Sequence, residues 1–333
     1  MAVKEKKEIE IAGGTNVLAQ TPIIVSASRS TDIPAFYSDW FIERLEAGYV
    51  KWYNPFNNQP LYVSFANTKL FVFWSKNPKP MLERLDKLEA LGFKQYYFQF
   101  SLNDYVAEGF EPNVPNVEER IDTFRRLSDR IGKERVIWRF DPLLLTDKIS
   151  VEVLLERIAK IGRRLKGYTE KLVFSFIDIA SYKKVKKNLV DSGCREFIAE
   201  EQLKFANGLA RLNDELGLEL ATCGELADLS ECGIKHNKCV DDELIMRLFH
   251  GDEELMNYIG AEKDIFGEWH IVKRAKDKGQ RAACGCIVSK DIGEYNTCPH
   301  LCHYCYANAN NAAALENCER HQTYPHSETI TGK

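Results

Sequence analysis

Short runs of apolar residues alternate with longer amphipathic stretches through most of this 333-residue chain, and this alternation constrains its fold more than any other feature. The runs are rich in valine, isoleucine and phenylalanine and have the length of buried strands, whereas the stretches between them have the length and periodicity of helices. Strands joined by such helices need crossover connections and form a parallel sheet. We therefore expect strands at residues 22–26, 61–65, 70–74, 96–100, 136–140, 172–176 and 218–222.

The intervening stretches predict helices between these strands, and the strand–helix unit repeats about six times. Such repetition favours an α/β fold of the TIM-type or partial (β/α) barrel kind, with a doubly wound open sheet as the alternative. The first twenty residues are polar and are expected to form a frayed end or one short strand. Helices are expected at residues 40–47, 81–91, 117–131, 150–165 and 200–216, with a lysine-rich helix starting at Ser181.

The character of the sequence changes two-thirds of the way along the chain. We expect a β/α barrel body over residues 1–222 and a cysteine-rich region over residues 223–333 that closes the barrel. In the second region, residues 241–259 are expected to be helical. A strand at 284–289, a cysteine loop and a helix at 307–320 are expected to form one more β/α unit.

Composition excludes several classes of protein. Hydrophobic residues make up 44% of the chain and charged residues 28%, which excludes a disordered protein. The 45 lysine and arginine residues are outnumbered by 49 aspartate and glutamate residues, which disfavours a nucleic-acid partner without excluding it. No apolar run approaches the length of about 20 residues that spans a bilayer, and no apolar segment of a signal peptide follows the N-terminus. We expect a cytoplasmic protein with no membrane partner.

Nine of the ten cysteines lie between positions 223 and 318, and three of them form the motif Cys298-x3-Cys302-x2-Cys305. In a reducing cytoplasm, a group of thiols is more typical of a metal or catalytic site than of disulfides. Three thiolates on one short loop can bind three irons of a 4Fe-4S cluster and leave the fourth iron open to a ligand. Zinc is the alternative, because His300 and His303 lie inside the motif.

The remaining cysteines outnumber what one such cluster needs. Cys232 competes with its neighbours for a place in a second site, whereas Cys194 and Cys318 fall in helical contexts and are expected to bind no metal. Structural zinc and free buried thiols are the alternatives to a second iron–sulfur cluster. Four residues are interpreted as ligands of an auxiliary 4Fe-4S cluster or of zinc: Cys223, Cys239, Cys284 and Cys286.

Polar side chains at the ends of the expected strands are the candidates for chemistry, because active sites of β/α barrels form at the carboxyl ends of the strands. Arg29 or Lys76 could hold a carboxylate or phosphate group. Arg139 and Asp141 could form a buried pair in which each satisfies the other. These four residues are our candidate catalytic residues.

The three-cysteine motif resembles the signature of the radical S-adenosylmethionine superfamily, with Tyr304 in the aromatic position before the third cysteine. This resemblance implies an enzyme that cleaves S-adenosylmethionine reductively at a 4Fe-4S cluster, with an electron from a donor such as flavodoxin or ferredoxin. The product is a 5′-deoxyadenosyl radical that abstracts a hydrogen atom from the substrate. By the same resemblance, five residues are expected to contact the cofactor: Ser26, Ser28, Tyr304, Tyr306 and Asn308.

In that superfamily the motif follows the first strand of the barrel, whereas here it lies in the last tenth of the chain. We therefore expect a circularly permuted barrel, in which the C-terminal strand–loop–helix unit closes against the strand at residues 23–26. The segment from Ser26 to Asp32 then occupies the place where the superfamily binds the amino group of S-adenosylmethionine, although the usual Gly-Gly-Glu is absent.

Four segments carry a second resemblance: Val25-Ser-Ala-Ser-Arg-Ser-Thr-Asp-Ile-Pro, Phe73-Trp-Ser-Lys-Asn-Pro, Trp138-Arg-Phe-Asp-Pro and the stretch from Asp291-Ile-Gly to Tyr306-Ala-Asn. Through them the chain resembles an uncharacterised bacterial family, the domain-of-unknown-function 1848 family. This implies a radical S-adenosylmethionine-like protein and supplies no substrate. More loosely, Cys302-His-Tyr-Cys305-Tyr306 is similar to the cysteine loop of spore photoproduct lyases. The alternatives are therefore a nucleic-acid repair enzyme of that kind and a zinc-stabilised binding protein without catalytic activity.

Overall fold

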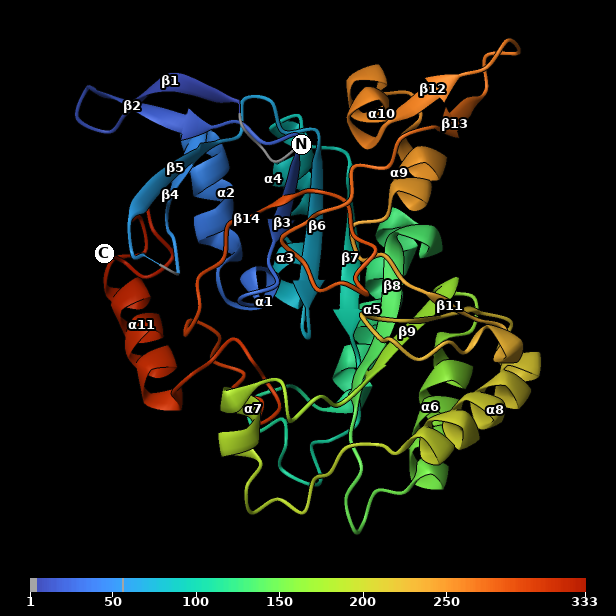
Figure 1. Cartoon of the computed structure of the whole chain (residues 1–333). Coiled ribbons are helices and arrows are strands. Elements are labelled where there is room, and N and C mark those ends of the chain that lie inside the picture. The colour runs from blue at the N-terminus through green and yellow to red at the C-terminus, as the bar shows by residue number, and fades with distance from the viewer. Residues whose placement is uncertain (1–4, 56) are drawn as a thin grey trace.

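The computed structural model describes residues 5–55 and 57–333. Its centre is an eight-stranded sheet in which all neighbouring strands are parallel (Figure 1). A large parallel sheet confirms the expected α/β class. The strands, in their order across the sheet, are β11 (Ile234–His236), β10 (Glu219–Thr222), β9 (Lys171–Phe176), β8 (Val136–Leu143), β7 (Tyr96–Ser101), β6 (Leu70–Ser75), β3 (Ile24–Ala27) and β14 (Lys290–Asp291).

From β3, which lies beside the edge strand β14, the strand order advances in one direction to β11 at the opposite edge. A doubly wound sheet differs, because its strand order reverses at a switch point. Among the described residues, no pairing between β11 and β14 closes the sheet. β11 and β14 lie in the cysteine-rich region, so both parts of the chain contribute to one sheet.

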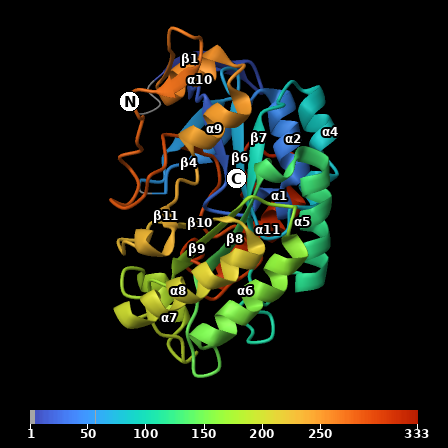
Figure 2. The ribbon, with the colours of Figure 1, turned by 90° about the vertical axis from the view of Figure 1, so that its right-hand side faces the viewer.

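One face of the sheet packs against the connecting helices (Figure 2). Phe73 of β6 is fully buried between Phe41 of α2 and Phe98 of β7, with ring centroids 5.6 and 4.8 Å away. In the described residues, no helix is long and apolar enough to cross a membrane. The connecting helices are α1 (Ile33–Phe36), α2 (Ser38–Ala47), α3 (Lys79–Leu82), α4 (Leu85–Ala90), α5 (Val117–Ile131), α6 (Val151–Leu165), α7 (Lys183–Asn188) and α8 (Ala199–Leu216).

The opposite face carries the alternate residues of the same strands, because successive side chains of a strand point to opposite sides. Val72, Tyr97 and Val173 are buried there in a second apolar cluster with α9 (Asp242–Phe249) and α10 (Glu253–Ile259). Both faces are therefore covered, which explains why the strands read as continuous apolar runs in the sequence.

The C-terminal strand joins the sheet beside the first parallel strand. β14 pairs with β3, with Lys290 opposite Val25 and Asp291 opposite Ser26. Gly293 follows at a point of close approach, where an added Cβ would stand 1.9 Å from the hydroxyl oxygen of Ser28. A cysteine loop and α11 (Asn311–Thr323) come next. A strand–loop–helix unit therefore lies against β3, as expected, but its strand is β14 rather than residues 284–289.

Several boundaries differ from the expectations. The expected strand at 284–289 is wrong, because this stretch packs into the core: Ile287 N–H donates to the Val240 carbonyl at 3.1 Å, and the strand forms later, at 290–291. The expected helix at 241–259 is two helices, since Asp252 caps α10 by accepting the Leu255 N–H at 2.9 Å. The expected helix at 81–91 is likewise divided into α3 and α4.

A second sheet, outside the parallel one, was not expected. The polar N-terminal residues form a two-stranded hairpin rather than a frayed end or one short strand, and the predicted strand at 61–65 pairs with this hairpin instead of entering the main sheet. Within the described residues the order is β1-β2-β5-β4. The strands are β1 (Lys6–Ile11), β2 (Thr15–Gln20), β5 (Pro60–Ser64) and β4 (Tyr49–Tyr53), and a separate hairpin joins β12 (Ala261–Lys263) to β13 (Trp269–Ile271).

A buried group of charges fastens the cysteine loop to the sheet. The Glu111 side chain is 0% exposed, and Lys76 donates to it at 2.9 Å. Tyr304 donates its hydroxyl to the same carboxylate, and the Arg120 guanidinium lies 3.6 Å from it. Burial alone would raise the pKa of Glu111, but the charges of Lys76 and Arg120 and the hydrogen bonds lower it to about 2.

We predict that Glu111→Gln destabilises the protein by about 3–5 kcal/mol, because it leaves buried cations without a counter-charge. The pKa of this carboxyl is depressed in the folded state, so its contribution to stability is complete above the unfolded value near 4.5 and is lost as the pH falls towards 2. Urea unfolding at pH 7 and at pH 3 measures both effects. Glu118→Gln, in an exposed pair with Arg164, is the control and costs about 1 kcal/mol or less. Equal losses in the two variants would contradict the prediction.

Candidate functional site

A cavity of about 620 Å³ opens at the carboxyl ends of the parallel strands, where side chains that end or follow β3, β6, β8, β9 and β10 meet. The four candidate catalytic residues all line it, as do four of the five expected cofactor contacts. The fifth, Ser26, is fully buried, and its hydroxyl lies 2.7 Å from that of Ser289. Both groups of predicted metal ligands also line this cavity: Cys298, Cys302, Cys305, Cys223, Cys239, Cys284 and Cys286.

The three motif cysteines are free thiols on the loop between β14 and α11. A turn joins two of them, since the Cys305 N–H donates to the Cys302 carbonyl at 3.0 Å, and Ala307 donates its N–H to the Cys305 sulfur at 3.3 Å. Burial, the Asp32 carboxylate and the other two motif thiols raise the pKa of Cys298 well above its usual value. A metal that binds this thiol at neutral pH therefore has to displace its proton.

The two histidines inside the motif are engaged in other contacts. His300 is 2% exposed, and its ring nitrogens lie 2.9 Å from the Asp32 carboxylate and 3.1 Å from the Asn113 carbonyl. Asp32 also accepts the N–H of Lys76 at 2.7 Å. His303 packs its ring edge-on to Phe110. His300 therefore fastens the motif to the start of α1 and has no free nitrogen for zinc.

Lys76 and Tyr304 belong to the buried group around Glu111. The Lys76 ammonium donates to the Tyr304 hydroxyl at 2.7 Å, and Asn103 donates to the same hydroxyl at 3.0 Å. Because their polar atoms have partners within the protein, these two residues hold the segment between Cys302 and Cys305 in place. The Lys76 ammonium is bound to Glu111 and Tyr304, so it positions the motif loop and is not free to bind a substrate.

The turn after β3 is bound by Asp291. Its carboxylate accepts the Ser28 hydroxyl and the Arg29 backbone N–H, each at 2.8 Å. The Arg29 guanidinium lies 4.8 Å from the Trp74 ring and faces the cavity. Tyr306 donates its hydroxyl to the Arg29 carbonyl at 3.1 Å. The turn expected near the cofactor is therefore held by the cysteine loop itself.

Four cysteines from three separate segments form a second group of thiols. The sulfurs of Cys223 and Cys239 lie 3.5 Å apart, and the Cys239 N–H donates to the Cys286 sulfur at 3.2 Å. A hydrogen bond with Cys286 is the main cause that lowers the pKa of Cys284 to about 7. Cys232 instead contacts Asn207, outside the cavity wall. The predicted four cysteines are thus brought together and their competitor is not.

Guanidinium groups surround this second group. Arg139 donates to the Cys239 sulfur and to the Gln99 side chain, each at 3.1 Å, and pairs with Asp141 as expected. The charge of Arg29 acts on Cys286 and Cys239, and that of Arg281 acts on Cys223. Contacts among the thiols and burial raise the pKa of Cys223, Cys239 and Cys286, so a metal that binds them has to displace their protons. The arginine charges would then offset the negative charge of a metal–thiolate group.

The fit of these residues to a metal and a cofactor depends on which thiols and polar atoms have no partner within the protein. In the described chain, no three histidine, cysteine, aspartate or glutamate side chains already surround one metal position. The thiols are nevertheless free, close together and supplied with N–H donors, which is the donor chemistry of iron–sulfur clusters and zinc. Within the described residues, two buried oxygens in the cavity wall have no hydrogen-bond partner, Thr31 Oγ1 and Asn308 Oδ1. The residues therefore fit a polar ligand beside a metal–thiolate site.

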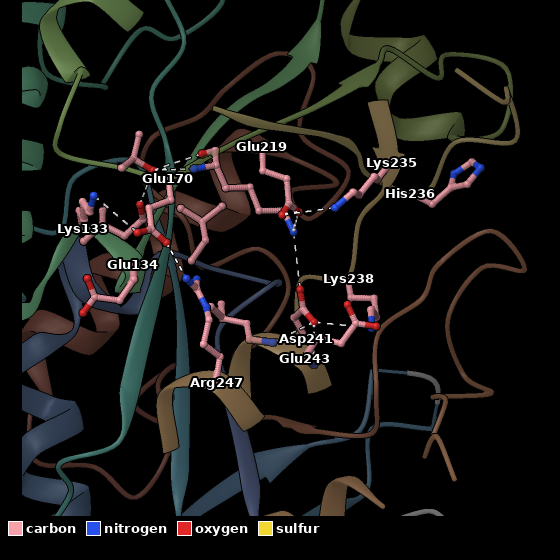
Figure 3. Close-up of a pocket in the computed structure, with 15 residues that line it drawn as sticks. Lys133, Glu134, Glu170, Glu219, Lys235, His236, Lys238, Asp241, Glu243 and Arg247 are labelled. Carbon is pink, nitrogen blue, oxygen red and sulfur yellow. Dashed lines mark hydrogen bonds and ion pairs between the residues drawn. The ribbon is translucent and has the colours of Figure 1, made fainter. Parts of the chain in front are cut away.

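A second cavity, of about 330 Å³, lies at the opposite ends of the strands (Figure 3). Its charged side chains pair with one another: Arg247 with Glu170, Lys171 with Glu219 and Lys238 with Asp241. Charges that are already paired leave little to hold a ligand, and this end of parallel strands commonly serves stability. The cysteine-lined cavity is therefore the candidate functional site.

Three residues at the site were missed in the sequence. Glu111 lies in a loop with no motif, so no spacing signal identifies it. Tyr182 and Arg281 line the cavity from segments that follow the strands by several residues, beyond the strand ends where we looked. The only sequence signal for Tyr182 is a weak one: it is an aromatic residue directly before a lysine-rich helix.

Comparison with known proteins identifies the family of this chain. No curated protein and no solved structure matches the chain. The model of one family, described as domain of unknown function (DUF1848), matches residues 24–307. The matched range begins with β3 and ends just after Cys305, so it includes the parallel sheet and both groups of thiols. The chain belongs to the DUF1848 family.

Proposed function

We propose that this protein is a radical S-adenosylmethionine enzyme with a 4Fe-4S cluster on Cys298, Cys302 and Cys305. The observation that carries the proposal is that these thiols line one cavity with unpartnered polar atoms at the carboxyl ends of a parallel sheet. When bound, the cluster would supply the electron that cleaves S-adenosylmethionine to a 5′-deoxyadenosyl radical. The abundance of free thiols suits a reducing cytoplasm.

The strand order supports a circularly permuted barrel. In the superfamily that the motif resembles, the cysteine loop follows the first strand, and here it follows β14, which stands beside β3 at the start of the sequential order. A move of this β/α unit from one end of the chain to the other preserves its place in the sheet. Permutation is tolerated when the relevant chain ends lie close together.

Residues of the chain can be assigned to binding the cofactor, positioning the motif cysteines and binding the substrate. Asn308 Oδ1 and Thr31 Oγ1 accept hydrogen bonds from the bound cofactor, since they have no partner among the described residues. Tyr306 offers an aromatic face, and Tyr304 with Lys76 holds the motif cysteines in place. Arg29 lines the cavity beside the cofactor and is available to an acidic group of the substrate.

The second group of thiols would hold an auxiliary 4Fe-4S cluster or zinc. Either metal group bound by four thiolates carries two negative charges, which Arg29, Arg139 and Arg281 offset. Zinc at this site would favour the alternative function, a zinc-stabilised binding protein, because a zinc ion with four protein ligands has no open position for a substrate. Anaerobically purified protein separates these cases, since iron–thiolate proteins are brown and zinc proteins are colourless.

We predict that Cys302→Ala abolishes the reductive cleavage of S-adenosylmethionine, because the cluster loses one of its three protein ligands. The measurement is formation of 5′-deoxyadenosine by reconstituted protein reduced with dithionite. Cys194→Ala, a change outside the cavity wall, is the control and keeps wild-type cleavage. Normal cleavage by the Cys302→Ala variant would refute the assignment. His300→Ala is expected to keep its iron, in contrast to a histidine that binds zinc.

We also predict about eight irons per reconstituted chain and about four in the triple alanine variant of Cys298, Cys302 and Cys305, from four irons per cluster. Iron, zinc and sulfide analysis provides the count. Cys286→Ala is expected to lower the melting temperature more than Cys302→Ala does, because its site ties three chain segments together. Cys232→Ala is the control with unchanged iron. One zinc and no iron in the triple variant would show that the second site is structural zinc.

A further inference from the structure

α7 carries a group of positive charges that have no ion-pair partners in the part of the chain that the structure describes. Four of its six residues are lysines, Lys183, Lys184, Lys186 and Lys187. Elsewhere lysines pair with carboxylates, as Lys171 does with Glu219, but within the described residues none of these four has an ion-pair partner. The chain as a whole carries a net charge of −4. A local group of four unpaired cations on an acidic protein is a surface that attracts an anionic partner.

α7 also stands beside the motif cysteines. Tyr182, directly before the helix, and Val185, its one buried residue, both line the cavity. The Tyr182 ring stacks on the Tyr306 ring with centroids 5.6 Å apart, and Tyr306 directly follows Cys305. The Lys184 ammonium lies 5.0 Å from the ring of Tyr295, which is another residue of the cavity wall. A partner bound on α7 would therefore lie within two aromatic rings of the motif.

We propose that α7, together with Tyr182, is the docking surface for a small acidic one-electron carrier protein. This inference rests on the proposed function, because reductive cleavage needs one external electron. The reduced carrier loses one electron, and the sulfonium of S-adenosylmethionine takes it up as its bond to the 5′-carbon breaks to methionine and a 5′-deoxyadenosyl radical. Docking on α7 brings the carrier to the cavity mouth nearest Cys305.

The dimensions and charge favour a protein over a nucleic acid. A helix of six residues is only about 9 Å long, which suits the compact patch of a transient protein contact. Nucleic-acid-binding domains carry extended basic faces and a basic overall balance, whereas this chain has an excess of acidic residues. Complementary charge chiefly accelerates association, as required of a carrier that must arrive and leave.

The test uses Lys183→Glu/Lys187→Glu, which reverses two charges on one face of the helix. The control is Lys87→Glu/Lys160→Glu, the same charge change at exposed positions of α4 and α6. Binding of flavodoxin is measured by calorimetry at low and moderate salt with full-length protein. We expect an affinity loss of about tenfold or more in the α7 variant, weaker wild-type binding at higher salt, and no loss in the control.

Activity then separates docking from catalysis. Cleavage driven by reduced flavodoxin should fall by about the same factor in the α7 variant, while cleavage driven by dithionite should stay at the wild-type level. Absence of flavodoxin binding by the wild type, or unchanged binding by the α7 variant, would overturn the docking proposal. Equal loss of both activities in the α7 variant would overturn it as well. So would an α7 variant that loses binding to a short oligonucleotide but keeps its binding to flavodoxin. Wild-type flavodoxin binding without any dithionite-driven cleavage would instead overturn the proposed function and leave the docking surface standing.

Discussion

The hydrogen bonds of Asp291 hold the functional site together. This carboxylate, at the end of a two-residue strand, binds the Ser28 hydroxyl and the Arg29 backbone N–H after the first parallel strand. The short pairing of β14 with β3 supplies few backbone hydrogen bonds by itself, so these side-chain contacts have a large share in placing the cysteine loop. Gly293 permits this contact, since any side chain there would collide with Ser28. This contact brings residues from opposite parts of the sequence together, and the contacts of Tyr304 with Glu111 and of His300 with Asp32 then fasten the motif beside the cavity.

Much of the parallel sheet was predictable, because strands covered on both faces read as continuous apolar runs and helices between them are amphipathic. The helix predicted at 117–131 has the observed bounds, and the strand predicted at 136–140 begins at Val136 as expected but continues to Leu143. The strand expected at 284–289 was wrong for a physical reason: an apolar run containing Ile287 and Val288 can fill a core as readily as it can extend a sheet. The N-terminal hairpin was missed because exposed strands lack that apolar signal.

The site was predictable where chemistry requires rare residues in a fixed pattern. The seven cysteines that were predicted as ligands all line one cavity, and four of them come from three separate segments. The role of Lys76 was not predictable, because its partner Glu111 lies in a loop without any motif and the contact exists only in three dimensions. The contacts of His300 with Asp32 and with the Asn113 carbonyl were not predictable either, because both partners lie far from the motif in the sequence. The sequence thus predicts which cysteines gather at one site better than it predicts the residues that hold those cysteines in place.

The late position of the cysteine loop has a consequence for biosynthesis. Strands β3 to β11 leave the ribosome before β14 and the motif cysteines do, and chains fold progressively as they are made. The greater part of the sheet can therefore assemble before any of the three motif thiols exists to capture a metal. If the motif holds the proposed cluster, delivery of that cluster would follow assembly of strands β3 to β11, and the pairing of β14 with β3 would be the step that makes the motif competent to receive it.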